Sequence, residues 1–300
     1  MKKNKLWFLL ALLICMAVLC TAAAAADGEE STGVTALWLG SKDLKEGGYW
    51  EIGFPDLSGS SEVTSVSSDD SWNVHYDPAE NTLTLRDADF TGSCMDADGL
   101  SASQSTAALF VDGDLSINII GTNSIASNYF YGDYSYGAYI DGGNISISGQ
   151  DGARLTFTGG NESSSRGVYA TSTSNLTMES GTLSCVGGVG GSSRGMNWYG
   201  NITLQGTSRL VSNKGDGYGS TVYVSGLLTI ENTARMDCKG IITDYGEIHI
   251  KDNGVMFSNG TISRFDSIGV EDNGEITAEA ITGADEITAI NYAEITGGNR

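Results

Sequence analysis

Apolar residues separated by one polar residue recur along the last two-thirds of this chain. The repeated pairs are Leu115/Ile117, Ile145/Ile147, Leu176/Met178, Ile202/Leu204, Leu228/Ile230, Ile248/Ile250, Ile268/Val270 and Ile287/Ala289. Their first members follow one another at intervals of 30, 31, 26, 26, 20, 20 and 19 residues. Apolar residues at every second position are typical of a strand with one buried face. Because a recurring interval of about 20–50 residues is typical of stacked repeats, the pattern predicts an all-β solenoid.

Each repeat unit contains three short candidate strands separated by turn residues. In one unit they are Thr221–Ser225, Leu228–Ile230 and Arg235–Cys238. The chain has 41 glycines but only two prolines, Pro55 and Pro78, which both precede the repeats. This distribution suits strands that pair on both sides, where proline would remove a hydrogen-bond donor. We therefore expect a single-stranded parallel β-helix of about eight rungs, right-handed because parallel crossovers are right-handed.

Aligning the units predicts which side chains lie above one another. The inward column of the first strand is Leu109, Ala138, Val168, Met196, Val222 and Ile242, and that of the third strand is Phe157, Cys185, Ser212, Cys238, Ser258 and Ala278. Adjacent strands lie about 4.8 Å apart. Since Cys185 and Cys238 are two rungs apart, their Cα atoms exceed the roughly 7 Å limit for a disulfide. We expect both thiols to be free and buried.

A row of mostly aromatic residues is predicted to face outward beside the first of these columns. It consists of Phe110, Tyr139, Tyr169, Asn197 and Tyr223. Aromatic rings give a sugar ring a large contact area at a low entropic cost. We therefore predict a carbohydrate-binding face formed by Phe110, Tyr139, Tyr169 and Tyr223. The alternative is a ladder of rings that stabilise only one another.

The longer early rungs indicate insertions on this same half of the solenoid. Insertions in repeat proteins often gather on the binding face. One expected insertion, Asn128–Tyr136, carries the aromatic residues Tyr129, Phe130, Tyr131, Tyr134 and Tyr136. Their number favours a binding role over a simple spacer.

Two acidic residues occupy the same place in adjacent rungs. Asp112 and Asp141 each stand directly before a glycine. Carboxylates on adjacent strands, about 5 Å apart, repel one another unless a cation or a proton lies between them. We predict that this pair bonds sugar hydroxyls or holds calcium, and the alternative is a pair of solvated Asp-Gly turns.

The first 26 residues have the pattern of a signal peptide. Basic residues are followed by the apolar run Leu6–Leu19 and the small residues Ala22–Ala26. We expect cleavage before Asp27, or else retention of the apolar run as an anchor, and no later apolar run is long enough to span a bilayer. Residues 27–105 are expected to form a β-rich capping segment and residues 106–300 the repeats. The location predicted is extracellular or at the cell surface.

Charge and chemistry narrow the possible functions. The net charge is −21, from 16 basic and 37 acidic residues, which excludes the clustered Lys and Arg that nucleic-acid binding needs. Neither a zinc site nor a disulfide framework is indicated, because no Cys-x-x-Cys pair occurs. Only two histidines are present, and no Ser-His-Asp or Cys-His set can be assembled. We expect a monomeric protein that is not an enzyme.

Two segments carry a resemblance to a known family. The run Ala107–Ile117, with Gly121–Ile125, resembles rungs of bacterial extracellular right-handed parallel β-helix proteins, including clostridial carbohydrate-binding β-helix proteins that are similar to polysaccharide lyases. The segment Trp72–Leu85 looks like the lead-in to such repeats in secreted proteins of gut Firmicutes. The resemblance covers about residues 70–300 and implies the fold and secretion. Lyases of this fold use a Lys or Arg base, for which Arg166 and Arg194 are only loose candidates.

Three functional hypotheses follow. The first is a secreted or surface protein that binds polysaccharide along the aromatic face without catalysis. The second is a polysaccharide lyase or hydrolase. The third is a structural or adhesive spacer of a surface protein.

Overall fold

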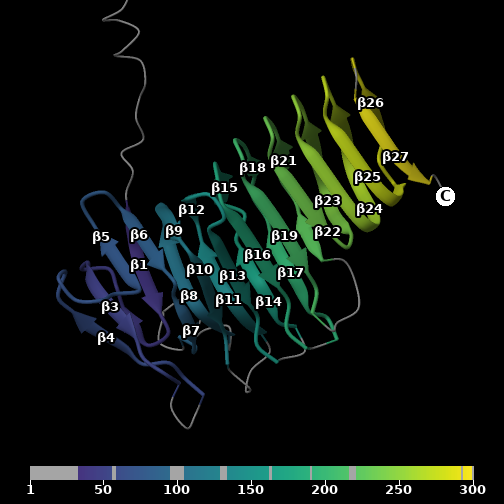
Figure 1. Cartoon of the computed structure of the whole chain (residues 1–300). Coiled ribbons are helices and arrows are strands. Elements are labelled where there is room, and N and C mark those ends of the chain that lie inside the picture. Colours follow the sequence, from purple (N-terminus) through teal and green to yellow (C-terminus); the bar gives the residue numbers. More distant parts are fainter. Residues whose placement is uncertain are drawn as a thin grey trace, which may run out of the picture. The chain divides into compact units, whose positions relative to one another are not determined.

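The strands of this protein form three parallel stacks. The computed structural model describes residues 33–55, 59–94, 105–128, 134–161, 164–189, 191–215, 221–291 and 293–298. Every regular element in these ranges is a β-strand. The expected signal peptide lies outside them. Figure 1 shows the strands succeeding one another in chain order, from purple through teal to yellow.

Each stack takes one strand from every rung. The first contains β8 (Ser105–Gly113), β11 (Tyr134–Asp141), β14 (Arg166–Ala170), β17 (Arg194–Trp198) and β20 (Val222–Val224). The second contains β6 (Thr82–Arg86), β9 (Leu115–Ile120), β12 (Gly143–Gly149), β15 (Ser174–Met178), β18 (Ile202–Leu204), β21 (Leu227–Ile230) and β26 (Glu286–Ala289). The third contains β7 (Asp89–Thr91), β10 (Thr122–Ala126), β13 (Arg154–Thr158), β16 (Thr182–Val186), β19 (Arg209–Asn213), β22 (Arg235–Cys238) and β27 (Glu294–Gly298).

Three longer strands continue from one stack into the next. They are β23 (Ile241–Ile250), β24 (Val255–Val270) and β25 (Glu275–Thr282). β23 and β24 join β21 to β26 in the second stack, and β24 and β25 join β22 to β27 in the third. Successive strands of each stack pair in parallel, so the predicted parallel β-helix is confirmed.

The second stack has the predicted register throughout. Ile145 pairs with both Leu115 and Leu176, and the same column continues through Ile202, Leu228, Ile248, Ile268 and Ile287. From Leu115 to Ile268 these residues are at most 3% exposed. The alternating pattern therefore placed one face of each strand from β9 to β24 in the core, whereas Ile287 in β26 is 42% exposed.

The predicted inward columns of the other two stacks hold with one exception. Cys185 pairs with Phe157 and Ser212, while Cys238 pairs with Ser258, and both cysteines are buried and free. In the first stack, however, Val222 pairs with Ile241. The prediction of Ile242 in this column was wrong by one residue. Gly240 immediately before Ile241 has a φ of +136°, and this conformation brings the chain into the strand one residue early.

The N-terminal segment contributes strands to the first rung. β6 pairs in parallel with β9, and β7 with β10. Leu83 lies opposite Ile117, two residues along the strand from Leu115. The two-residue shift keeps Leu83 on the core face, because side chains alternate with a period of two.

Antiparallel strands cover the edge of this first rung. β1 (Val34–Leu39) pairs antiparallel with β8 and with β2 (Lys42–Asp43). β3 (Gly48–Ile52) lies between β4 (Val63–Val66) and β5 (Val74–Asp77). β5 also pairs with β6. An uncovered edge would present unpaired backbone groups to other chains. The proposed division at residues 27–105 and 106–300 stays a prediction, since β6 and β7 already belong to the stacks.

The core can be tested at a central rung. We expect Leu204→Ala to lower the free energy of unfolding by about 2–5 kcal/mol, because the Leu204 side chain is fully buried and its loss leaves a cavity. The adjacent Thr203 faces outward, so Thr203→Ala should cost less than about 1 kcal/mol. Urea unfolding of both variants measures the difference. Equal losses would contradict the assignment of inward and outward positions.

The buried thiols give a second test. Burial raises the pKa of the Cys185 thiol strongly, and it raises the pKa of Cys238 to about 11. Because the thiolate is the reactive form, both residues should resist alkylation at about pH 8 until the protein unfolds. Mass spectrometry of the labelled peptides with and without denaturant measures this. A Cys185–Cys238 disulfide recovered from native protein would contradict the predicted spacing.

Candidate functional site

The predicted aromatic row lies in register on the outer side of the first stack. Tyr139 pairs with Phe110 on one side and with Tyr169 on the other. Asn197 then lies between Tyr169 and Tyr223. The row from Phe110 to Asn197 is carried by β8, β11, β14 and β17, which Figure 1 shows side by side.

The rings in the first part of the row stack on one another. The centroids of Phe110 and Tyr139 are 5.8 Å apart with an interplanar angle of 13°, and those of Tyr139 and Tyr169 are 5.2 Å apart with an angle of 20°. Parallel strands about 4.8 Å apart bring identical flat rings into this arrangement. Each ring therefore covers the face of the next. Ring edges and hydroxyl groups remain available to a ligand.

Phe110 is buried within this ladder. Its side chain is only 3% exposed and clusters with Cys94, Ala107 and Tyr136. Strand β1 pairs with β8 and places Trp38 opposite Phe110. A strand from the N-terminal segment thus lies beside Phe110, and this burial argues against the prediction that Phe110 contacts a sugar.

A bend in β11 and β14 adds further side chains to the same surface. In β11, Tyr136 and Tyr139 face outward and their ring centroids are 5.3 Å apart, while Ala138 between them belongs to the core. Gly137 allows this departure from strict alternation. A Cβ atom there would lie 2.6 Å from both the Gly167 oxygen and the Thr158 nitrogen. Only glycine fits such a close backbone approach.

The equivalent glycine in β14 has the same role. A Cβ atom on Gly167 would lie 2.5 Å from the Val186 nitrogen and 2.6 Å from the Gly195 oxygen. Arg166 and Tyr169 consequently face the same surface. The guanidinium carbon of Arg166 lies 5.7 Å from the centre of the Tyr169 ring.

These side chains enclose an open pocket of about 320 Å³, which we call the tyrosine pocket. It is lined by Ser105, Tyr134, Tyr136, Tyr139, Arg166, Tyr169 and Tyr199. Five of the seven residues are tyrosines, so the lining combines apolar ring edges with hydroxyl groups. Few other groups in proteins offer both in one side chain.

Sequence reasoning located only part of this pocket. Tyr134 and Tyr136 lie in strand β11, although they were assigned to an inserted turn. Tyr129, Phe130 and Tyr131 are outside the described residues. Tyr199 was missed, although it stands two residues after Asn197 and its ring lies 5.6 Å from that of Tyr169 and 5.0 Å from that of Tyr223. The period of two along the strand was the signal that could have identified it.

Arg166 is the cation of the tyrosine pocket. Its guanidinium lies 5.3 Å from the centre of the Tyr134 ring and 6.0 Å from that of Tyr136. Nη1 donates a hydrogen bond of 2.7 Å to the Ser164 carbonyl oxygen. In the amide orientation that satisfies both of its groups, Asn197 accepts a hydrogen bond of 2.9 Å from Nε. The guanidinium is thus fixed over the rings by cation–π and hydrogen-bond contacts.

A second arginine continues this row. Arg194 pairs in register with Arg166, and its guanidinium lies 5.5 Å from the centre of the Tyr223 ring. The two arginines thus begin strands β14 and β17 of adjacent rungs.

Burial raises the pKa values of the pocket tyrosines. It raises the pKa of Tyr136 well above the ordinary range, against the opposing effect of Arg166. It also raises the pKa of Tyr139 to about 12, with additional contributions from Asp141 and Tyr169. The pKa of Tyr169 is raised in the same way. Neutral pH lies below even the ordinary tyrosine pKa of about 10, so these hydroxyl groups are protonated and can donate hydrogen bonds as well as accept them.

Asp112 and Asp141 form an acidic row. It lies on the side of the aromatic row opposite Arg166 and Arg194. The two aspartates pair in register, as predicted. Burial raises the pKa of Asp141, and repulsion from Asp112 raises it further. Asp112 accepts a hydrogen bond from the Thr35 hydroxyl. Within the described ranges no group of three or more His, Cys, Asp or Glu side chains could hold a metal ion, so the suggested calcium site has two carboxylates.

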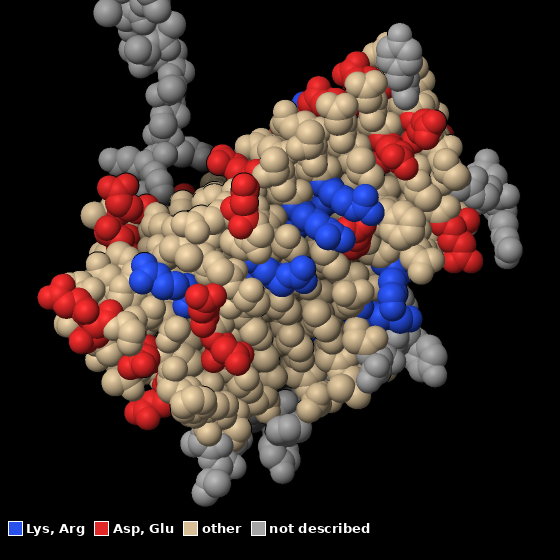
Figure 2. Space-filling model, in the orientation of Figure 1, with Lys and Arg blue, Asp and Glu red and all other residues tan. Residues whose placement is uncertain are grey.

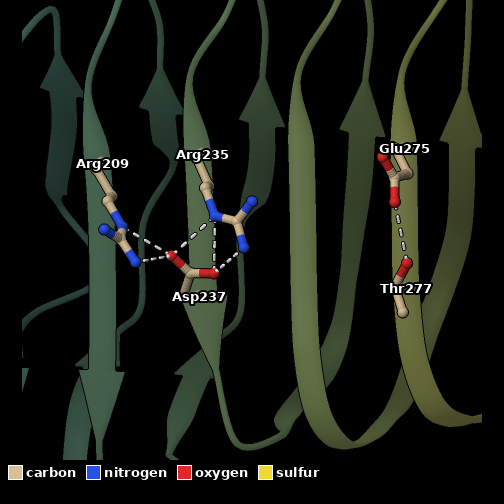
Figure 3. Close-up of polar contacts among 5 residues, drawn as sticks. All are labelled: Arg209, Arg235, Asp237, Glu275 and Thr277. Atoms are coloured by element: carbon tan, nitrogen blue, oxygen red, sulfur yellow. Dashed lines mark hydrogen bonds and ion pairs between the residues drawn. The ribbon is translucent and has the colours of Figure 1, made fainter.

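Arg209, Arg235 and Lys251, elsewhere on the solenoid, have acidic partners. Asp237 accepts hydrogen bonds of 2.8 Å from Arg209 Nε and from Arg235 Nε (Figure 3). Although burial alone would raise the pKa of Asp237, these bonds hold it below its ordinary value. Figure 2 shows the same pattern on one face, where groups of basic side chains border acidic ones. Lys251 similarly lies 2.6 Å from Glu231.

No family model, curated protein sequence or solved structure matches this chain, and nothing identifies it as a clostridial carbohydrate-binding protein. Among the residues described, no helix is long and apolar enough to cross a membrane. The chemistry of the tyrosine pocket is therefore the basis for a functional proposal.

The tyrosine pKa shifts predict a loss of stability at alkaline pH. A tyrosine whose pKa is raised by folding stabilises the folded state fully below the unfolded pKa of about 10, and this stabilisation disappears as the pH rises toward the folded value. We expect the free energy of unfolding to fall between about pH 10 and the folded-state pKa of Tyr139, about 12. Urea unfolding at several pH values measures this. If the free energy of unfolding of Tyr139→Phe falls with pH as steeply as that of the wild type, the Tyr139 hydroxyl does not contribute to the loss of stability.

Proposed function

We propose that this protein is a secreted or cell-surface β-helix that binds polysaccharide at the tyrosine pocket. The observation that carries the proposal is the gathering of five tyrosines and one arginine around one open pocket on the solenoid surface. Location outside the cell is supported by the signal-like residues 1–26. Sugar recognition needs flat apolar contacts and convergent hydrogen-bond donors and acceptors, and tyrosines supply both.

The ladder geometry changes how a sugar would be bound. Tyr139 and Tyr169 stack on each other, so a sugar ring would contact their edges and hydroxyl groups instead of lying on their faces. Tyr134 is 37% exposed and offers the most accessible ring. Tyr223, beyond Tyr199, extends the surface along the solenoid. A polymer lying parallel to the axis would meet equivalent groups on successive rungs.

Three parallel rows would orient such a polymer. Arg166 and Arg194 form the basic row, the tyrosines the central row, and Asp112 and Asp141 the acidic row. Carboxylates accept hydrogen bonds from sugar hydroxyls, and guanidinium groups donate them. Because a guanidinium keeps its charge in proteins, Arg166 suits binding better than the proton abstraction that a lyase requires.

A structural spacer is the second candidate function. It is favoured by the stacking of Phe110, Tyr139 and Tyr169, since such a ladder stabilises the sheet without any ligand. The buried position of Phe110 fits this role. The two candidates differ in whether the tyrosine hydroxyls matter for binding.

Removing hydroxyls while keeping the rings separates these functions. We expect the triple variant Tyr134→Phe, Tyr139→Phe, Tyr169→Phe to bind its polysaccharide at least about tenfold more weakly, because each lost hydrogen bond costs about 0.5–1.5 kcal/mol. Affinity gel electrophoresis against a polysaccharide panel, with calcium and with EDTA, measures the change. Tyr49→Phe, on the N-terminal strand β3, is the matched control.

Each outcome of this experiment is informative. Unchanged retardation of the triple variant would contradict binding at the tyrosine pocket. No retardation of the wild type by any polymer would favour the spacer. Loss of binding in EDTA would support a calcium ion at Asp112 and Asp141, and release of shortened polymer would support an enzyme.

A further inference from the structure

We infer that the tyrosine pocket receives a carboxylate, so that the bound polysaccharide contains an acidic sugar. The inference rests on the proposed function and names the chemical class of its ligand. It is carried by the state of Arg166, whose positive charge faces the pocket without a carboxylate partner in the described part of the protein.

Arg166 is held in place by neutral groups, and no carboxylate among the described residues neutralises it. Two hydrogen bonds are present at its guanidinium, one from Nη1 to the Ser164 oxygen and one from Nε to the Asn197 amide. Both acceptors are uncharged. A guanidinium has five N–H groups, so several donors remain for a ligand at the rim of the tyrosine pocket.

The missing carboxylate partner is not explained by a shortage of acids. The chain has 37 acidic and 16 basic residues, and Arg209, Arg235 and Lys251 each contact a carboxylate within 2.7 Å. Arg166 is half-buried among aromatic rings, where an unpaired charge is less well solvated than at the open surface. A ligand carboxylate would supply the missing counter-charge.

The other groups around Arg166 also favour an anion. The rings of Tyr139 and Tyr169 stack on each other and present their edges, which carry partial positive charge. The hydroxyl groups of Tyr136 and Tyr139 remain protonated and can donate hydrogen bonds. This side of the tyrosine pocket therefore offers mainly donors.

The acidic row determines which way the carboxylate of a bound sugar points. Asp112 and Asp141 lie across the aromatic row from Arg166 and Arg194. Their charges would repel a carboxylate and accept hydrogen bonds from sugar hydroxyls. A uronic-acid type residue would thus direct its carboxylate toward Arg166, whose planar group can bind a carboxylate through two parallel hydrogen bonds.

The test compares a uronan with the same polymer after chemical reduction of its carboxyl groups. We expect the wild-type protein to bind the uronan at least about tenfold more tightly, because charge-assisted hydrogen bonds are roughly twice as strong as those between neutral groups. Arg166→Gln should remove this preference, and Arg166→Lys should retain only part of it, because an ammonium group lacks the planar fork. Arg154→Gln removes an equal charge from an exposed position on β13 and should keep the preference.

The possible results distinguish this inference from the proposed function. Equal binding of both polymers by the wild type, an undiminished preference in Arg166→Gln, or tighter Arg166-dependent binding of a sulfated polymer would overturn the carboxylate assignment alone. If the wild type binds neither the uronan nor any neutral polymer, the proposed function itself fails. Circular dichroism and thermal unfolding of each variant show whether the fold is intact, and Arg166→Lys keeps the test valid if Arg166→Gln does not fold.

Discussion

Parallel, in-register pairing is the constraint on which the rest of this structure depends. Each strand hydrogen-bonds to the equivalent strand of the rung before and after it, about 4.8 Å away. Residues of the same kind, whether apolar, aromatic or polar, consequently lie next to one another at equivalent positions of successive rungs. The asparagine turns show the same effect, since Asn175 donates a hydrogen bond of 3.0 Å to Asn144 and accepts one of 3.3 Å from the Asn201 backbone. Stability and surface chemistry thus arise from the same stacking.

That regularity also limits what the surface can bind, because stacked rings cover one another. The tyrosine pocket exists where the pattern is broken. Gly137 and Gly167 bend their strands so that residues three apart face one surface, and Asn197 interrupts the aromatic row. The tilt of 59° between the Tyr169 and Tyr199 rings contrasts with the 20° between Tyr139 and Tyr169. The ring edges and hydroxyl groups of the tyrosine pocket are therefore concentrated at the irregular rungs.

The periodicity of the sequence predicted the stacks better than it predicted the pocket. The apolar pairs of the second strand determine their own register, because a shift of one residue would expose the core. The place of Ile241 depended on the conformation of Gly240, and the burial of Phe110 depended on β1, a strand from about 70 residues earlier in the chain. Neither the position of Ile241 nor the burial of Phe110 can be predicted from the residues of a single repeat. Tyr136 was misplaced because the bend at Gly137 arises from contacts with other strands.

Because each rung contacts only its neighbours, the length of the molecule and its pocket chemistry can vary independently. The tyrosine pocket is formed by residues of β8, β11 and β14 and by Tyr199 just after β17. The later apolar pairs recur at about 20 residues and contribute no residue to it. Duplication or loss of one whole later coil would preserve every inward column. Such a change would alter how far the solenoid extends without altering the residues that line the tyrosine pocket, so evolution could adjust length and pocket chemistry separately.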